Sequence, residues 1–126
     1  LLFCGVYDIG QMGKGGDILG WFVNVTGWAY SGKRNWRDDG DFASVNFIRF
    51  LASDFPPAFI SVGNADPLGL QSVALAKALQ ERGRTVETLF FPPDHAPPLA
   101  HEYQFDLDTE AGQLALAKAT TWLKGL

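Results

Sequence analysis

The clearest pattern of hydrophobic and polar residues lies in the second half of the chain. The apolar run 58–63 is bounded by Pro-Pro and Gly-Asn, which predicts a buried strand. Apolar residues recur at helical spacing over 70–82, and Gly83 follows as a C-terminal cap. The β-branched and aromatic run 85–91 predicts a second strand. Strand, helix and strand in this order indicate a parallel pair with a right-handed crossover.

A last helix is predicted after a proline-rich loop over residues 92–108. Asp108 or Thr109 can cap its start, and apolar residues repeat at helical spacing as far as Leu123.

The first half is less regular. Leu1–Val6 predicts a buried strand, and the glycine-rich residues 9–20 predict a loop. Residues 21–41 indicate an irregular or short-helical insertion, and residues 43–52 a short helix that ends before Pro56. The fold class is therefore α/β. Its sheet lacks strands on the N-terminal side, because parallel sheets usually have more than three strands.

Composition narrows the class of protein. Hydrophobic residues make up 47% of the 126 residues and charged residues 19%, as in a globular domain with a core. The net charge of −4 and the scattered basic residues do not favour a nucleic-acid partner. No apolar run reaches the ~18 residues of a membrane span. One cysteine, Cys4, and two histidines form no typical zinc set, so we expect no metal and no cofactor.

Asp66 follows the predicted strand 58–63 in the segment Gly-Asn-Ala-Asp-Pro. Chemistry in open α/β sheets collects beyond the carboxyl ends of strands. Pro67 biases Asp66 toward extended backbone and favours a helix start after it. Two roles stay open on this pattern: a functional carboxylate at the sheet edge, or a helix N-cap.

His101 lies on the loop after the last strand, at the same edge and one strand over. A histidine beside a carboxylate forms the base and acid of a nucleophilic triad, in which the carboxylate orients the ring and the ring takes a hydroxyl proton. His95, next to Asp94, is the alternative base. Either histidine would otherwise be an ordinary surface residue.

The run from Phe55 to Leu68 resembles the acid loop of α/β-hydrolase esterases and lipases, most closely the hormone-sensitive-lipase-like carboxylesterases. There a strand preceded by Pro-Pro ends in Gly-x-x-Asp-Pro-Leu, whose Asp is the triad acid. The resemblance therefore implies that Asp66 is the acid. It covers about residues 1–8 and 43–124, so the fold it implies is the C-terminal portion of an α/β-hydrolase.

The same resemblance implies that His101 is the base. The family's base is a histidine followed closely by an aromatic residue, often as His-Gly-Phe. His101-Glu102-Tyr103 with Phe105 is similar, with Glu in place of Gly. The closing segment Asp108–Leu123 resembles the family's last helix.

The nucleophile of this family is a serine on a Gly-x-Ser-x-Gly turn, upstream of the strand that Leu1–Asp8 resembles. That pattern and the glycine-rich oxyanion segment are both absent here. The pattern fails at every serine of the chain: Ser31, Ser44, Ser53, Ser61 and Ser72. The sequence also begins without Met in what resembles a strand interior. We interpret it as a fragment, a processed chain or a truncated form, and expect no useful ester hydrolysis by the chain alone.

Residues 9–50 occupy the place where this family inserts cap or lid helices over the acyl pocket. Four aromatic residues are candidates to line that pocket, with packing of the insertion onto the body as the alternative: Trp21, Phe22, Trp28 and Trp36. Residues 51–126 would then form the unit that carries the acid and the base.

The expected function is hydrolysis of small acyl esters. The expected protein partner is an upstream segment of the same protein, or a complementing or swapped chain, that pairs with the open edge of the first strand. The alternatives are a non-catalytic α/β binding or scaffold module and another α/β-hydrolase, such as a peptidase or a dienelactone hydrolase. The compartment is unknown, and the single cysteine slightly favours the cytoplasm.

Overall fold

The structure, a computed structural model, describes residues 1–11, 18–43 and 46–126. The chain divides into two units, one made of Leu1–Val6 with Leu51–Leu126 and the other of Tyr7–Phe50. None of the helices in the described part of the chain is long and apolar enough to cross a membrane.

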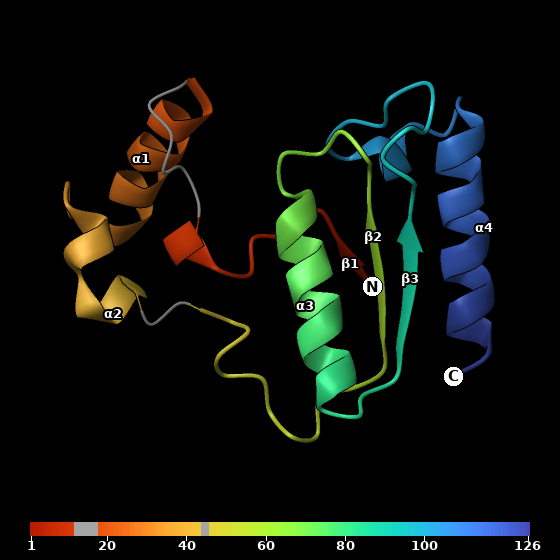
Figure 1. Cartoon of the computed structure of the whole chain (residues 1–126), viewed down its shortest axis with the longest axis horizontal. Coiled ribbons are helices and arrows are strands. Elements are labelled where there is room, and N and C mark those ends of the chain that lie inside the picture. Colours follow the sequence, from red (N-terminus) through yellow and green to blue (C-terminus); the bar gives the residue numbers. More distant parts are fainter. Residues whose placement is uncertain (12–17, 44–45) are drawn as a thin grey trace. The chain divides into compact units, whose positions relative to one another are not determined.

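The first unit contains a small open sheet of parallel strands (Figure 1). Its strands are β1 (Leu2–Phe3), β2 (Ala58–Val62) and β3 (Val86–Phe90), in the order β1-β2-β3. Ile60 in β2 pairs with Leu2 on one side and with Thr88 on the other. The predicted α/β class and the two predicted C-terminal strands are confirmed.

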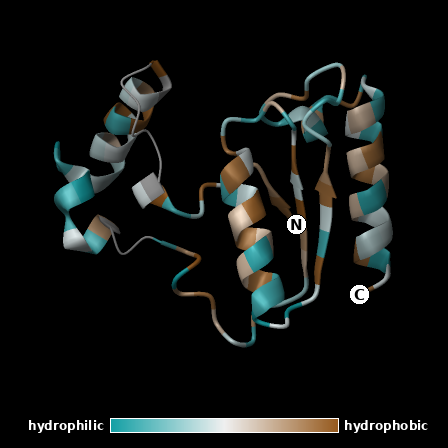
Figure 2. Cartoon of the chain, viewed as in Figure 1, coloured by the Kyte–Doolittle hydropathy of each residue, from teal (hydrophilic) through white to brown (hydrophobic). Residues whose placement is uncertain are grey.

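The central strand β2 is covered on both faces, which explains why its residues are apolar apart from Ser61, whose hydroxyl meets that of Tyr103. All five of its residues are buried. The sheet lies between α3 (Gly69–Glu81) and α4 (Glu110–Lys124), and both helices carry hydrophobic and hydrophilic positions side by side (Figures 1 and 2). Phe59 packs against Trp122 of α4, with ring centroids 6.0 Å apart. The core on this side is formed by Phe59, Leu89, Leu99, Tyr103, Ala115 and Ala119.

Both long helices of this unit have the expected end signals. Gly83 takes the left-handed backbone conformation, with φ of 68°, just after α3. Thr109 precedes α4, and its hydroxyl oxygen accepts a hydrogen bond from the Gly112 N–H at 3.1 Å. The predicted helices over 70–82 and after residue 108 are therefore confirmed.

The first strand is shorter than the predicted Leu1–Val6. It ends at Phe3, because Cys4 adopts a φ of 50°, which a strand cannot accommodate. Leu1 and Val6 are exposed, so the expected burial of the whole segment is wrong. β1 is an edge strand of the sheet, and its outer side has no strand partner among the described residues.

The second unit is helical over most of its described residues. It contains α1 (Ile18–Ser31), α2 (Gly40–Ala43) and two short 3₁₀ turns, Ile9–Gln11 and Trp36–Asp38. The prediction of loop over 9–20 is wrong from Ile18 onward, and residues 12–17 lie outside the described residues.

The prediction of an irregular or short-helical insertion over 21–41 is wrong for residues 21–31, where α1 continues to Ser31 without a break. It fits the two short helical segments that follow, Trp36–Asp38 and the start of α2. α1 is longer than the expected short helix, although it contains Gly20 and Gly27. The low helix propensity of glycine is a weak effect and does not interrupt it. Residues 46–50 form a bridge and turns instead of the predicted helix over 43–52, of which residues 44–45 lie outside the described residues.

Trp36 is the best-buried aromatic residue of the second unit, at 2% exposure. It packs edge-on against Phe42 and directly over Gly27, where any side chain would collide with the indole. Trp36 therefore packs within its own unit, which matches neither the pocket role nor the expected packing of the insertion onto the body. Trp21, Phe22 and Trp28 are exposed, and their pocket role stays a prediction.

The packing of β2 gives a direct test of the core. Phe59→Ala should lower the free energy of unfolding by about 3–5 kcal/mol, because Phe59 is fully buried between β1 and α4. Phe105→Ala is the matched control: Phe105 is 65% exposed, and its edge-on contact with Phe3 is worth about 1 kcal/mol. Urea unfolding measures both, and equal losses would contradict the assigned core.

Candidate active site

The loop after β2 holds Asp66 in a fixed, buried position. The Asp66 N–H donates to the Gly63 carbonyl at 3.2 Å, and its Oδ1 accepts from the Leu68 N–H at 2.7 Å. The N-cap position of α3 is Leu68, so Asp66 orders the turn before the helix without being its N-cap. One carboxylate oxygen thus supports the backbone and leaves Oδ2 for another partner.

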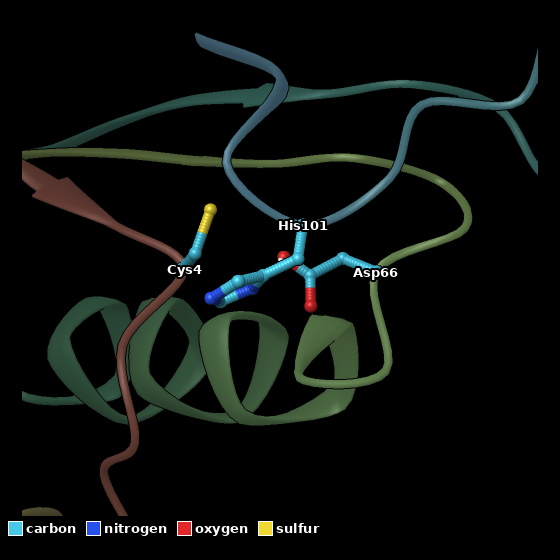
Figure 3. A group of neighbouring side chains, drawn as sticks. All are labelled: Cys4, Asp66 and His101. Carbon is cyan, nitrogen blue, oxygen red and sulfur yellow. Dashed lines mark hydrogen bonds and ion pairs between the residues drawn. The ribbon is translucent and has the colours of Figure 1, made fainter. Parts of the chain in front are cut away.

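That partner is His101. The Nδ1 of His101 lies 3.0 Å from Oδ2 of Asp66, and the two side chains point toward one another from separate loops (Figure 3). The side chain of Asp66 is fully buried, whereas that of His101 is 43% exposed. A buried carboxylate that accepts from Nδ1–H leaves Nε2 as the free basic atom of the ring.

The backbone of the two loops meets at Gly63. A Cβ at this position would lie 2.8 Å from the Leu99 carbonyl carbon and 2.9 Å from the Ala100 oxygen, and closer still to the Leu99 oxygen. Only glycine permits this approach. The close contact brings the backbone just before His101 against the carboxyl end of β2.

Asn64 joins the same two loops by hydrogen bonds. Its side-chain oxygen accepts from the Leu99 N–H at 2.9 Å, and its amide donates to the His95 carbonyl at 3.1 Å and more weakly to the Pro93 carbonyl at 3.4 Å. The backbone adds a bond from the Ala65 N–H to the Leu99 carbonyl at 3.0 Å. Asn64 therefore positions the histidine loop, a role that its sequence context did not reveal.

Behind His101 the chain makes an unusual turn. Glu102 has a φ of 63°, which is uncommon for a residue other than glycine, and its N–H donates to the Cys4 sulfur at 3.4 Å. The Gln104 side-chain oxygen and nitrogen each lie 3.2 Å from the same sulfur, the oxygen as acceptor and the nitrogen as donor. The side-chain nitrogen of Gln104 also donates to the Ser61 carbonyl at 3.0 Å. These contacts tie the turn after His101 to the ends of β1 and β2.

Cys4 is buried beneath the site, at 7% exposure. Burial raises the pKa of its thiol, and the bonds with Gln104 and the Glu102 N–H offset part of that rise. The carboxylate of Asp66 raises the pKa of the thiol further. A thiol held in its neutral form is a poor nucleophile.

The remaining polar groups near the site have structural roles. Ser61 is fully buried, and its hydroxyl lies 2.6 Å from the Tyr103 hydroxyl. Burial raises the pKa of Tyr103, and the hydrogen bond with Ser61 offsets part of the rise. The His95 ring packs against Phe91, with ring centroids 4.7 Å apart, so His101 and not His95 is the histidine brought to Asp66.

Comparison with known proteins finds no relative of this chain. No protein-family model matches the sequence, and neither a curated protein nor a solved structure matches it.

Gly63→Ala tests the contact between the loops. The added methyl group should cost about 1–3 kcal/mol of unfolding free energy and displace His101 from Asp66, because the Leu99–Ala100 backbone must move. NMR signals of the His101 ring should shift in the variant.

Gly69→Ala is the control, because its Cβ would meet only ordinary contact, at 3.9 Å from the Gly63 carbonyl oxygen. It should be neutral or slightly stabilising at the first residue of α3. A Gly63→Ala variant with unchanged stability and an unchanged His101 spectrum would contradict the proposed fit.

The raised pKa of Cys4 predicts the pH dependence of thiol alkylation. Because the folded-state pKa lies above the unfolded value, the alkylation midpoint of the native chain should occur at higher pH than in urea. The neutral thiol stabilises the fold below the unfolded pKa, and this contribution is lost as the pH rises through the folded one. Iodoacetamide rates across pH measure the midpoint, and a native midpoint at or below the unfolded one would refute the assignment.

Proposed function

We propose that this chain carries the acid Asp66 and the base His101 of a Ser-His-Asp triad in a carboxylic ester hydrolase of the α/β-hydrolase fold. The observation that carries the proposal is the 3.0 Å contact between His101 Nδ1 and Asp66 Oδ2. It joins a buried carboxylate to an exposed imidazole, on loops that follow two adjacent parallel strands.

The pair is suited to proton transfer. Asp66 accepts from Nδ1–H and fixes the ring tautomer, so the Nε2 lone pair can take a proton from a serine hydroxyl as that oxygen attacks an ester carbonyl. The carboxylate stabilises the resulting imidazolium. The ring then gives its proton to the leaving alcohol, and a water repeats the cycle on the acyl-enzyme.

The backbone after His101 adds independent support. The esterases that this sequence resembles often have glycine directly after the catalytic histidine. Glu102 occupies that position here, and its φ of 63° lies in the region that glycine adopts most easily. A residue other than glycine here thus holds a backbone conformation that glycine adopts most easily, at the position where the resemblance leads us to expect glycine.

The serine would come from polypeptide outside the described residues. Within these residues the His101 ring has one hydrogen-bonding partner, Asp66, while Ser61 and Ser72 are fully buried in the core. A strand that pairs in parallel with the open side of β1 would place its own carboxyl end beside His101. We propose such a strand, from an upstream segment or a second chain, as the carrier of the Gly-x-Ser-x-Gly turn.

The test uses a longer protein that contains this sequence together with a Gly-x-Ser-x-Gly segment. Nitrophenyl butyrate hydrolysis should fall about 10⁴-fold in kcat for Asp66→Asn, because the ring loses its tautomer. His101→Ala should lower kcat by about 10⁶-fold, since the base is lost. The 126-residue chain alone should show no turnover above background.

His95→Ala is the matched control, because this histidine contacts Phe91 and only its main-chain carbonyl bonds to Asn64. Its activity should equal that of the unmodified protein. A His101→Ala variant as active as His95→Ala would refute the proposal. No ester turnover and no fluorophosphonate labelling by the longer protein would favour a non-catalytic module, and turnover of amide substrates alone would favour a peptidase.

A further inference from the structure

Three metal-binding side chains of different chemistry meet at this site. Cys4, Asp66 and His101 each offer one donor atom, and these atoms lie within 4.8 Å of one another. Figure 3 shows the three residues on three separate chain segments, which follow β1, β2 and β3 in turn. No sequence pattern indicates this set, because its members are up to 97 positions apart and only one is a histidine.

We propose that Cys4, Asp66 and His101 form a binding site for a thiophilic divalent cation, represented by Zn²⁺, with the fourth position open to solvent. Sulfur, nitrogen and carboxylate oxygen are the donors that zinc takes in proteins, and three protein ligands are enough for a zinc site whose fourth position holds water or substrate. This inference goes beyond the proposed function, and ion binding does not depend on ester hydrolysis.

The spacing of the donors suits a tetrahedral ion. Zinc bonds of about 2.0–2.3 Å separate donor atoms by about 3.3–3.6 Å at tetrahedral angles. The Nδ1 to Oδ2 distance of 3.0 Å is close to that separation. At the 4.8 Å limit the sulfur must approach by about 1.2–1.5 Å to reach a tetrahedral separation, within the reach of a side-chain rotation.

Burial and access also suit an ion. Asp66 is fully buried and Cys4 nearly so, whereas the His101 side chain is 43% exposed and leaves a path from solvent. Zn²⁺ would replace the thiol proton of Cys4, which leaves to solvent, and the proton on His101 Nδ1, with the neutral ring then protonated on Nε2. The two positive charges of Zn²⁺ would be balanced by the negative charges of the Cys4 thiolate and the Asp66 carboxylate.

The surroundings of Cys4 resemble those of a supported ligand. The Glu102 N–H and the Gln104 amide both donate to the sulfur, at 3.4 and 3.2 Å. Donors of this kind stabilise a thiolate and orient it toward a metal. The bonds that the thiol makes to the Gln104 oxygen and to Asp66 would be lost with the proton.

Metal binding and the acid–base pair exclude each other. An ion between Oδ2 and Nδ1 removes the hydrogen bond that fixes the ring, so zinc would inhibit ester hydrolysis. This consequence rests on the proposed function, whereas the binding site does not. The two are separable, because ion binding is measured on the 126-residue chain without a substrate.

The experiment titrates the reduced chain with Zn²⁺ in a calorimeter and with Co²⁺ in a spectrophotometer. We expect one ion per chain and a thiolate-to-cobalt charge-transfer band. Cys4→Ser and His101→Ala should each weaken binding by at least about tenfold, because each removes a ligand. His95→Ala should bind as the unmodified chain does, since its ring lies on Phe91.

NMR of the unmodified chain avoids any effect of substitution on folding. Added Zn²⁺ should shift the ring nitrogen signals of His101 and leave those of His95 unchanged. No binding at millimolar Zn²⁺, or binding without a charge-transfer band and unaffected by Cys4→Ser and His101→Ala, would overturn the site. Zinc binding with these signatures but no inhibition of the longer hydrolase would keep the site and count against the proposed function.

Discussion

The structure of the site depends on one close backbone contact. The Cα of Gly63, at the carboxyl end of β2, lies against the carbonyls of Leu99 and Ala100, where no side chain fits. Asn64 reinforces the contact through its bond from the Leu99 N–H. Because Asp66 lies three residues after Gly63 and His101 directly follows Ala100, this contact fixes the distance between their side chains.

The rest of the first unit makes that contact possible. Parallel pairing of β2 with β3 sends both loops to the same edge of the sheet, and burial of Phe59 and Ile60 on opposite faces holds β2 between two helices. Cys4, just after β1, and Gln104, in the turn after His101, are joined by two hydrogen bonds. A rigid sheet edge therefore carries a site built almost entirely from loops, as in other open α/β sheets.

The sequence predicts those parts of the fold that have a regular period or a clear cap. The strand before Gly63, the helix after Asp66 and the cap at Thr109 follow from local patterns. The end of β1 was missed because it depends on the left-handed backbone of Cys4, which no local pattern indicates. The length of α1 was missed because its glycines resemble loop signals.

The same distinction holds for the site. The positions of Asp66 and His101 at one edge followed from topology, and their contact is present. Asn64 and Gln104 escaped notice because their roles are hydrogen bonds over 35 and 100 positions of sequence, which no spacing rule reveals.

The most direct test is the tautomer of His101 in solution, observed through its ring nitrogens by NMR at a pH at which the ring is neutral. If Asp66 holds Nδ1–H, the proton resides on Nδ1 and Nε2 is bare, and Asp66→Ala reverses this preference. A His101 ring protonated mainly on Nε2, and unchanged by Asp66→Ala, would contradict the account.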